Sequence, residues 1–298
     1  MAVLSIQSHV VFGYAGNTAA VFPMQRLGHE VWAINTVEFS NHTGYGNWKG
    51  KILGPELASD LVCGLFERGA LPRCEAVLSG YLGDAGIGQA VKDAVRMVRE
   101  AAPNALYCCD PVMGDKGRGF YVKPEIPELF KKELCPLADI ITPNQFELEA
   151  LTGVNTDTMD NARRAIDILH KMGPKVILVT SYFDHEAGTG EGISMLASGA
   201  DGLYRIDTPE LPLGANMAGS GDLTASVFLS HFLQTRNVKQ TLERCTASVF
   251  GILEKSFLGK QSGTGLGAQE QKTILEMLLI QAQEELVNPS RLFEAKKV

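Results

Sequence analysis

Residues 76–109, AVLSGYLGDAGIGQAVKDAVRMVREAAPNALYCC, contain one complete strand-helix-strand pattern. The flanking runs Ala76–Ser79 and Ala105–Cys109 are short and almost wholly apolar, which is typical of strands buried on both faces of a sheet. Between these runs, apolar residues recur at helical spacing through Ile87–Glu100. The segment therefore predicts neighbouring strands joined by a covering helix, the unit from which α/β proteins are built.

The same alternation of strand and helix continues on both sides of this segment. Further apolar runs predict strands at Val3–Ile6, Val31–Ile34, Asp139–Thr142 and Val176–Thr180. We therefore expect a three-layer α-β-α sandwich around a mostly parallel central sheet. The chain has no internal repeat and no linker long enough to separate domains, so residues 1–298 are interpreted as a single domain.

The last third of the chain has a different pattern. Ile193–Ala197 and Leu203–Asp207 flank a turn rich in glycine and predict an antiparallel pair of strands. The elements expected after this pair are helices at Leu223–Gln234, Lys239–Lys255 and around Glu270–Glu285, and a loose tail over about residues 288–298.

The composition restricts the class of function. Lys plus Arg number 27 and Asp plus Glu 34, so the formal net charge is −7. A protein that binds nucleic acid mainly through phosphates needs a basic face, so nucleic acid is not an expected partner. Glycine is unusually frequent, at 31 of 298 residues, and it favours tight turns and anion sites built from backbone amides.

Neither a membrane nor a secretory destination is expected. Residues 1–25 contain no basic segment and no run of ~18 apolar residues that could span a bilayer. The six cysteines form no C-x-x-C pair and no zinc-site spacing. Cysteines of this kind fit a reducing cytoplasm.

Polar residues and glycines follow each of the six expected parallel strands. In an open α/β sheet the binding site lies at the carboxyl ends of the strands, so these segments are expected to meet at one edge. Any one of them could be a helix cap and nothing more, but six at one edge favour a functional site. The segments begin at Gln7, Asn35, Ser79, Asp110, Thr142 and Thr180.

Residues 218–224, AGSGDLT, are the segment of the chain that indicates a chemical function most specifically. The glycines let consecutive backbone N–H groups point into one concavity, and the helix that follows adds about +0.5 charge at its N-terminus. This combination suits phosphate oxygens. Asp222 is either an N-cap carboxylate or a general base that accepts a proton from an attacking hydroxyl, and its place beside the anion site favours the base.

Two further segments contain groups suited to a divalent cation. Asp110 directly follows a strand and precedes Pro111, so it either starts a turn or holds a cation on phosphate oxygens. Asn144 and Glu147 lie three residues apart at an expected helix start and share a face. They are either a helix cap with a favourable dipole charge or part of a Mg²⁺ shell reached through water.

Other nucleotide-binding patterns do not fit this sequence. It contains no G-x-x-x-x-G-K-[ST] motif, and the G-x-G-x-x-A match at 263–268 follows an expected helix where a dinucleotide site needs a strand. The H-R-D and D-F-G motifs of protein kinases are missing as well. The 218–222 segment is therefore the strongest indication of nucleotide chemistry.

At these positions the sequence resembles a known family. Gly219-Ser220-Gly221-Asp222 is similar to the G-x-G-D signature of the ribokinase-like superfamily, and residues 144–147 are similar to its N-x-x-E motif. More narrowly, the chain resembles the pyridoxal kinases from about residue 3 to about residue 255. The matching segments are IQSHV (6–10), GYAGN (13–17), FSNHTGY (39–45), SGY (79–81), DPV (110–112) and ITPNQFE (141–147).

The resemblance implies an activity and a substrate pocket. The activity is phosphorylation by ATP of the 5′-hydroxymethyl group of pyridoxal, and also of pyridoxine and pyridoxamine. Ser8 matches a serine that hydrogen-bonds the pyridine ring. His42, Thr43 and Tyr81 match residues that line the vitamin pocket, and Tyr121 matches a tyrosine on a segment that closes over the substrate.

The resemblance also implies a phosphate side of the site and a homodimer. Asp222 matches the base, and the amides of Gly219–Gly221 match the anion hole, with Ser220 at the variable position of the signature. Mg²⁺ and a monovalent cation, commonly K⁺, are implied beside the phosphates. The residues that match metal-side positions are Asp110, Thr142 and Glu147, and those that match ATP contacts are Asn144, Thr180 and Ser181.

Three segments have a less certain place in this scheme. Residues 113–119, MGDKGRG, are either a surface loop with no role or a flap that excludes water, with Lys116 and Arg118 near the phosphates when it closes. Residues 184–201 and 209–217 match no family motif. The second of these is expected to cover the adenine, so nucleotide preference stays open.

Three functions remain open from sequence. The first is an ATP-dependent kinase of pyridoxal. The second is a hydroxymethylpyrimidine kinase or another small-alcohol kinase, because Tyr14, Tyr45, Tyr81 and Tyr121 suit a flat ring without choosing between pyridine and pyrimidine. The third is a protein that binds the vitamin without turnover. The intact 219–222 and 144–147 motifs disfavour it, because a binder needs no base.

Overall fold

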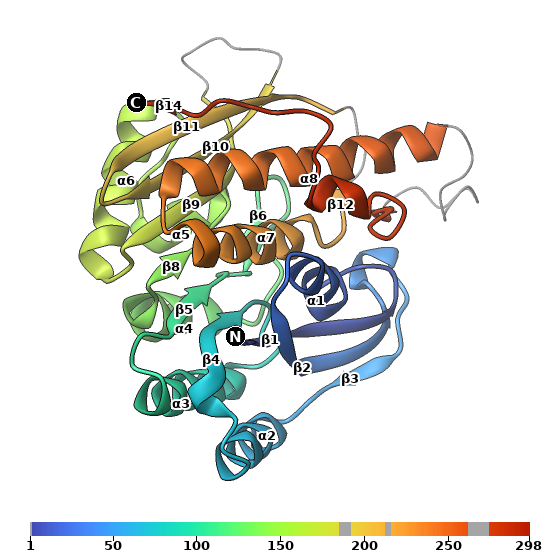
Figure 1. Ribbon diagram of the computed structural model, residues 1–298, viewed down its shortest axis with the longest axis vertical. Coiled ribbons are helices and arrows are strands. Elements are labelled where there is room, and N and C mark those ends of the chain that lie inside the picture. Colours follow the sequence, from blue (N-terminus) through green and yellow to red (C-terminus); the bar gives the residue numbers. More distant parts are fainter. Residues whose placement is uncertain (1, 185–191, 212–215, 262–273) are drawn as a thin grey trace.

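A ten-stranded sheet forms the centre of the computed structural model, which describes residues 2–184, 192–211, 216–261 and 274–298 (Figure 1). The spatial order of its strands is β14-β11-β10-β9-β8-β5-β4-β1-β2-β3. Six neighbouring strands, from β9 to β2 in this order, are parallel, and the strands at both ends are antiparallel. The bounds are β1 (Ala2–Phe12), β2 (Glu30–Asn41), β3 (Gly50–Ile52), β4 (Cys74–Ser79), β5 (Leu106–Cys109), β8 (Ile140–Ile141), β9 (Val176–Tyr182), β10 (Gly192–Gly199), β11 (Gly202–Pro209) and β14 (Lys296–Lys297).

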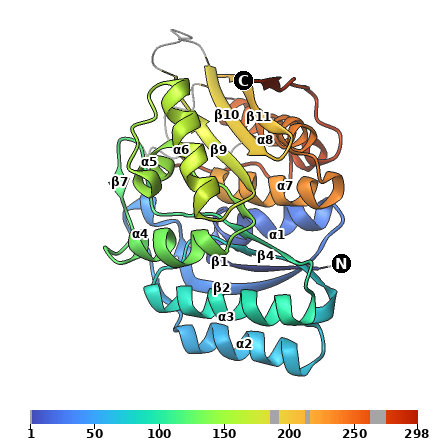
Figure 2. The same ribbon diagram turned by 90° about the vertical axis from the view of Figure 1, so that its left-hand side faces the viewer.

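Helices cover both faces of this sheet, which confirms the expected three-layer fold (Figure 2). One layer contains α1 (Asn17–Arg26), α7 (Ser220–Thr235) and α8 (Val238–Gln261). The other contains α2 (Pro55–Glu67), α3 (Ala85–Ala101), α4 (Ile126–Leu129), α5 (Gln145–Thr152) and α6 (Met159–Met172). No helix within the described ranges is long and apolar enough to cross a bilayer.

Buried strand residues alternate between the two helical layers. Val77 and Cys109 pack with the layer that contains α3, whereas their neighbours Leu78 and Cys108 pack with the layer that contains α7. A strand that is buried on both faces has no polar side, so its sequence is a continuous apolar run. This is the physical reason why the pattern of residues 76–109 predicted the fold correctly.

Strands β1 and β2, of 11 and 12 residues, are nearly three times as long as the four-residue runs that predicted them. The apolar runs predicted strands ending at Ile6 and Ile34, but β1 continues to Phe12 and β2 to Asn41. The two extensions pair with each other, as in His9 with Glu38, after the register shifts beyond Gln7. Polar residues in these extensions, such as Gln7 and Asn35, interrupt the apolar runs and so concealed the strand ends.

The antiparallel pair is confirmed, with β10 and β11 joined through Gly199 and Gly202. The helices expected at 223–234 and 239–255 lie within α7 and α8. The expectation of a last helix around Glu270–Glu285 is wrong for its described part. That part contains β13 (Ile274–Leu275) and a short 3-10 turn at Gln283–Leu286, while residues 262–273 lie outside the described ranges.

The C-terminal tail is not loose, contrary to expectation. Lys296 and Lys297 pair with Arg205 and Tyr204 of β11 as strand β14. Ala295 is buried, and its N–H donates to the side chain of Glu243 at 3.0 Å. The tail is held in place because it pairs with the outermost strand and covers that edge of the sheet. The tail has no apolar run, so its sequence did not predict this strand.

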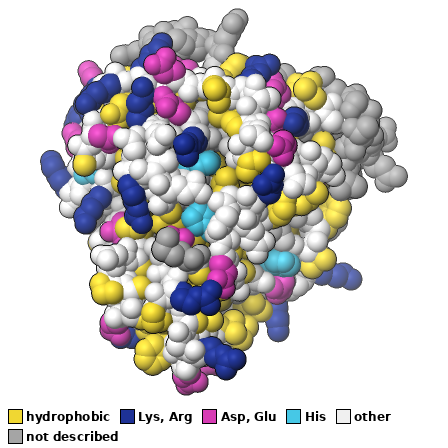
Figure 3. Space-filling model, viewed as in Figure 1, with side chains coloured by type: hydrophobic (Ala, Val, Ile, Leu, Met, Phe, Trp, Pro, Cys, Tyr) yellow, Lys and Arg dark blue, Asp and Glu magenta, His cyan; other side chains and the backbone are white. Residues whose placement is uncertain are grey.

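The surface has charges of both signs. On the face shown in Figure 3, Lys and Arg side chains are interspersed with Asp and Glu side chains among the described residues.

Candidate active site

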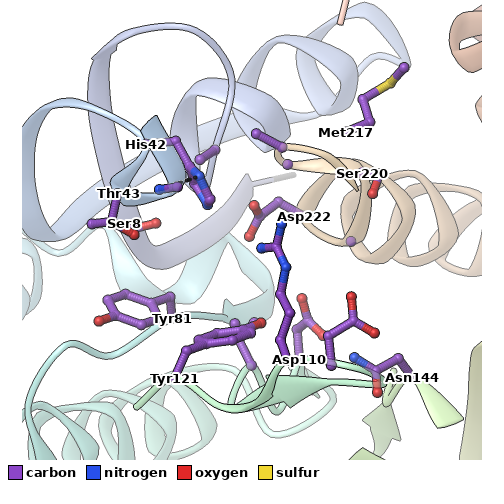
Figure 4. A pocket seen from close by; sticks show the side chains of 18 of the residues that line it. Ser8, His42, Thr43, Tyr81, Asp110, Tyr121, Asn144, Met217, Ser220 and Asp222 are labelled. Carbon is purple, nitrogen blue, oxygen red and sulfur yellow. Dashed lines mark hydrogen bonds between the residues drawn. The ribbon is translucent and has the colours of Figure 1, made fainter. Parts of the chain in front are cut away.

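One cavity of about 550 Å³ lies at the carboxyl ends of the parallel strands (Figure 4). All fifteen residues that the family resemblance assigns to catalysis, substrate, nucleotide or metal line this cavity, whereas Tyr14 and Tyr45, which were also expected to suit a flat ring, are not among its lining residues. Figure 4 shows Ser8, His42 and Thr43 on one wall, with Tyr81 and Tyr121 across from them. The complete predicted set is Ser8, His42, Thr43, Tyr81, Asp110, Tyr121, Thr142, Asn144, Glu147, Thr180, Ser181, Gly219, Ser220, Gly221 and Asp222.

The start of α7 forms an anion cradle at the cavity. Gly219 is the N-cap, with a φ of 75° in the left-handed region, and no side chain caps the first amides of the helix. A Cβ on Gly219 would lie 2.3 Å from the carbonyl oxygen of Tyr14, so only glycine fits. A Cβ on Gly221 would meet nothing within 4 Å. The first amides of α7 are therefore open to phosphate oxygens.

Asp222 is the third residue of α7 and not its N-cap, so the capping alternative for this residue is wrong. Its carboxylate Oδ2 accepts a hydrogen bond of 2.8 Å from the N–H of Gly16. Burial raises the pKa of Asp222 from 3.8 to about 6, while the backbone hydrogen bonds oppose the rise. The group is ionised at neutral pH and is a stronger proton acceptor than an ordinary carboxylate, which suits a general base.

Gly16 contacts Asp222 through its backbone N–H, a contact that sequence reasoning did not predict. Its φ is 57°, and a Cβ there would lie 2.1 Å from the carbonyl oxygen of Ser8. The absence of a side chain lets the loop after β1 fold back onto that strand and present its N–H to Asp222. The sequence signal was the GYAGN segment, which contains two glycines between a strand and a helix.

Asp110 is a buried carboxylate with an incomplete set of partners. It is 4% exposed, and its Oδ1 accepts a hydrogen bond of 3.0 Å from the hydroxyl of Thr142. Its Oδ2 is buried without a hydrogen-bond partner among the described residues. Burial, followed by the charges of Glu147 and Asp222, raises the pKa of Asp110 well above its usual range. A cation at Oδ2 would relieve both the burial and the repulsion, so these residues fit Mg²⁺.

Asn144 and Glu147 form a complete capping box at the start of α5. The Asn144 side chain accepts from the N–H of Glu147 at 2.9 Å, and Glu147 Oε2 accepts from the N–H of Asn144 at 3.0 Å. Glu147 Oε1 accepts from the N–H of Met113 at 2.9 Å. Burial raises the pKa of Glu147 to about 8. Because both oxygens already accept backbone N–H groups, contact with a cation through water is favoured over direct coordination.

The described residues contain no cluster of three or more His, Cys, Asp or Glu side chains that could hold a metal by themselves. This is compatible with Mg²⁺, which dehydrates reluctantly and takes most of its ligands from water and phosphate oxygens. A single directly coordinating carboxylate is therefore sufficient for the chemistry that the cavity indicates.

The glycine-rich segment 113–119 is a small hairpin beside the cavity, made of β6 (Gly114–Asp115) and β7 (Gly119–Phe120). The Asn144 side chain donates to the carbonyl oxygen of Gly114 at 2.9 Å, and the ring of Phe120 packs on the ring of Phe146 with centroids 5.0 Å apart. The N-x-x-E segment thus holds the base of the hairpin as well as the helix start. Arg118 lines the cavity, whereas the Lys116 ammonium lies 3.6 Å from Asp157.

The opposite part of the cavity has an apolar wall that sequence reasoning missed. Val10, Ala15 and Phe39 pack together there, and Tyr81 packs against them. They escaped detection because they are ordinary apolar residues on the strand extensions and the loop after β1. A wall of this kind suits the face of a flat ring.

His42 is held neutral at the edge of this wall. Its Nδ1 accepts a hydrogen bond of 3.2 Å from the N–H of Gly44, which places the ring proton on Nε2. Burial, followed by the nearby charge of Arg118, lowers the pKa of His42. The 3-10 turn Thr43–Tyr45 begins directly after it and brings Thr43 to the cavity.

Ser181 is one of two non-glycine residues with a positive φ in the described chain, at 53°. Its neighbour Thr180 donates its backbone N–H to the carbonyl oxygen of Pro143 at 2.9 Å, next to the capping box. A left-handed serine at the end of β9 is a strained conformation of the kind found at binding sites. Thr180 and Ser181 line the cavity on the side of Asn144.

An anion cradle, a buried carboxylate with an open oxygen, a second carboxylate whose pKa is raised to about 6 and a chamber with an apolar wall meet in one cavity. Together with the three-layer fold, they define a phosphotransferase that acts on a small ring-bearing alcohol.

Comparison with known proteins agrees with this class. A family model described as phosphomethylpyrimidine kinase matches residues 71–266. Pyridoxal kinase PdxY of Rubrobacter xylanophilus is 47% identical over 99% of this chain and 97% of its own length, and that of Corynebacterium diphtheriae is 42% identical with both chains fully covered. The structure of pyridoxal kinase from Leishmania donovani in complex with ADP and pyridoxamine has a TM-score of 0.87 at 30% identity, covering 99% of each chain.

The chain belongs to the pyridoxal kinase family. The resemblance seen in the sequence motifs is therefore confirmed at the level of the whole chain.

Proposed function

We propose that the protein uses ATP to phosphorylate the 5′-hydroxymethyl group of pyridoxal, and also of pyridoxine and pyridoxamine. The observation that supports this most directly is Asp222, a carboxylate with a pKa of about 6 between the anion cradle and the apolar-walled chamber. The L. donovani relative, which shares the fold, is described with ADP together with pyridoxamine and, in another structure, with pyridoxine.

In the proposed mechanism the residues of this chain mainly position the two substrates and neutralise the charge on the transferring phosphate, and they form no covalent bond with it. The substrate hydroxyl lies beside Asp222, which accepts its proton as the oxygen attacks the γ-phosphorus and the bond to ADP breaks. The amides of Gly219–Gly221 donate to the oxygens of the transferring group, where negative charge is spread in the transition state. Asn144, Thr180 and Ser181 contact ATP.

Asp110 would hold Mg²⁺ through its open Oδ2, with Thr142 orienting the carboxylate and Glu147 reaching the ion through water. The ion supplies charge neutralisation at the phosphate oxygens. K⁺ is proposed from the family resemblance as a second cation near the phosphates. Assays with Mg²⁺ or EDTA, and with or without K⁺, test both proposals.

On the acceptor side, Ser8 hydrogen-bonds the ring, and His42, Thr43, Tyr81 and Tyr121 enclose it. Tyr121 follows the 113–119 hairpin, and its N–H donates to the carbonyl oxygen of Met113 at 3.1 Å. Movement of the hairpin would therefore move Tyr121 with it, which suits a flap that excludes water from the transferring phosphate.

We further propose one domain spanning residues 1–298, a homodimer and a cytoplasmic location. The exposed Val11 and Phe12 at the end of β1 offer an apolar surface to a second copy. Five of the six cysteines are buried and all six are free, which suits a reducing compartment. Sedimentation of the protein, with Val11→Glu as the disrupting variant, tests the dimer.

The test of the activity is a panel of acceptors with ATP consumption and phosphorylated product both measured. Pyridoxal, pyridoxine and pyridoxamine are compared with hydroxymethylpyrimidine, the second candidate from the sequence, and with phosphomethylpyrimidine, the compound in the name of the matching family model. Each acceptor is assayed with Mg²⁺ or EDTA, and with or without K⁺. Preference for the pyrimidine supports the second candidate, and pyridoxal binding without ADP formation indicates a carrier.

A further inference from the structure

Glu276 is a buried carboxylate that touches two parts of the active site without lining the catalytic cavity. It is 5% exposed and lies directly after β13 (Ile274–Leu275), in a segment that resembles no family motif. Its Oε2 accepts a hydrogen bond of 3.1 Å from the N–H of Tyr14. Its Oε1 accepts a hydrogen bond of 2.8 Å from the hydroxyl of Tyr45.

The first of these partners belongs to the loop that orients the base. Residues 13–16 end at Gly16, whose N–H donates to Asp222. The carbonyl oxygen of Tyr14 is also the atom that leaves no room for a Cβ on Gly219 of the anion cradle. Displacement of Tyr14 would therefore disturb both the partner of Asp222 and the packing of the cradle.

The second partner belongs to the wall of the acceptor chamber. Tyr45 is the last residue of the 3-10 turn that follows His42 and contains Thr43. The N–H of Tyr45 donates to the carbonyl oxygen of His42 at 3.1 Å, so the turn moves as a unit with both cavity residues. The Tyr45 side chain is thus a tether for the residues that enclose the ring.

The backbone that carries Glu276 is itself anchored to the cradle. β13 pairs in parallel with β12 (Asn216–Met217), which leads directly into Ala218 and Gly219. One short segment therefore connects three parts of the site that are far apart in sequence, namely the cradle, the loop 13–16 and the turn 43–45.

The fit of the carboxylate against the loop is close. Gly13 has a φ of +84°, and a Cβ there would lie 2.3 Å from Oε1 of Glu276. A buried carboxylate is unfavourable unless hydrogen-bond donors satisfy it, and the Tyr14 amide and Tyr45 hydroxyl provide this compensation. Removal of the carboxylate would leave these two half-buried donors without their acceptor.

We propose that Glu276 is a positioning residue, which holds the loop 13–16 and the turn 43–45 in register with the anion cradle. It thereby sets where the acceptor hydroxyl lies relative to Asp222 and the phosphate. The inference about catalysis rests on the proposed kinase activity, whereas the link between the two segments does not.

Four variants separate this role from a general contribution to folding. Glu276→Ala removes both hydrogen bonds, and Tyr45→Phe removes only the tether to the turn. Glu276→Gln should preserve both, because the amide oxygen can accept from Tyr14 while the amide nitrogen donates to the Tyr45 hydroxyl. Glu284→Ala is the matched control, since Glu284 is an exposed carboxylate in the same C-terminal segment and contacts Arg26 at 3.3 Å.

The link is measured first by amide hydrogen exchange on the protein without substrates. Glu276→Ala should exchange at least about tenfold faster at Tyr14 and at Tyr45 to Gly46, whereas Tyr45→Phe should accelerate only the second site. Glu276→Gln and Glu284→Ala should match the wild type. Unchanged exchange at both sites in Glu276→Ala overturns the proposal, whatever the activity of the wild type.

The catalytic consequence is measured by steady-state kinetics. For Glu276→Ala we expect the KM for the acceptor to rise about tenfold and kcat to fall about tenfold, while the KM for ATP stays within about twofold. Tyr45→Phe should raise only the acceptor KM, and Glu276→Gln should restore both parameters. If Glu276→Ala lowers thermal stability but leaves acceptor KM and kcat unchanged, Glu276 is merely structural. If the wild type phosphorylates no acceptor, the proposed function fails, and the exchange result still decides the link.

Discussion

The two sides of the cavity are built in different ways. The phosphate side includes two short segments, 219–222 and 144–147, whose first amides are presented by helix starts and, at 144–147, by a capping box within four residues. The acceptor side consists of side chains from β1, β2, the turn 43–45 and the loop at Tyr81, tied together by the distant Glu276. Phosphate can be bound by local backbone geometry, whereas a particular ring needs a chamber assembled by long-range packing.

This comparison predicts that changes on the phosphate side mainly lower kcat, and that changes on the acceptor side mainly raise the acceptor KM. The largest effect is expected for Asp222→Asn. The amide keeps the size and can still accept from Gly16, but it cannot take the proton, so kcat should fall about 10²–10⁴-fold. ATP binding, measured by calorimetry, should change little.

Asp93→Asn, at a partly exposed carboxylate on α3, is the control and should retain wild-type turnover. An Asp222→Asn enzyme within tenfold of wild-type kcat would contradict the assignment of Asp222 as base.

The next largest effect is expected for Gly219→Ala in the cradle. The added Cβ would meet the Tyr14 carbonyl oxygen at 2.3 Å, and a φ of 75° is itself unfavourable by ~1–3 kcal/mol for alanine. We expect kcat/KM for ATP to fall about 10–100-fold. Steady-state kinetics at varied ATP concentration measure this fall.

Gly153→Ala provides a matched comparison, because Gly153 has a φ of +74° with nothing within 4 Å of the added Cβ. It should lose stability but retain activity. Equal losses of activity in the two variants would show that backbone strain, and not the cradle, explains the effect.

The pH dependence should reveal the raised pKa of Asp222. The base must be ionised to accept a proton, so kcat/KM for the acceptor should fall about tenfold per pH unit below about pH 6. If the carboxylate had its unperturbed pKa of 3.8, kcat/KM would begin to fall about two pH units lower. A pH profile of the wild type locates this fall, and a midpoint near pH 4 would mean that burial does not control this group.

The smallest effect is expected for Ser8→Ala on the acceptor side. Loss of one neutral hydrogen bond of ~0.5–1.5 kcal/mol should raise the acceptor KM roughly 2–13-fold. The KM for ATP and kcat should stay near wild type, and Ser59→Ala on α2 serves as the control. A Ser8→Ala enzyme with lowered kcat and an unchanged acceptor KM would contradict the prediction that changes on the acceptor side act mainly on the acceptor KM.

Sequence reasoning predicted the fold correctly where local patterns report the structure, and the residues that it assigned to the site line one cavity. The apolar strands at residues 76–79 and 105–109 and the glycine turn at 219–221 lie where they were expected. It failed for the ends of β1 and β2, for the helix expected around residues 270–285 and for the tail. In these regions strand pairing with distant segments, and not local apolar periodicity, determines the conformation.

By itself, the sequence indicated the layered fold, because strands buried on both faces are continuous apolar runs. It also indicated the two motifs of the phosphate side, because helix starts are formed by residues close in the chain. Only the tertiary structure decided the contacts of Gly16 and Glu276, the apolar wall and the open oxygen of Asp110. It also decided the raised pKa of Asp222, since desolvation depends on every segment packed around a group. The glycine-rich start of α7 can therefore be recognised from the sequence, whereas the pKa of Asp222 is raised only when the whole molecule folds around it.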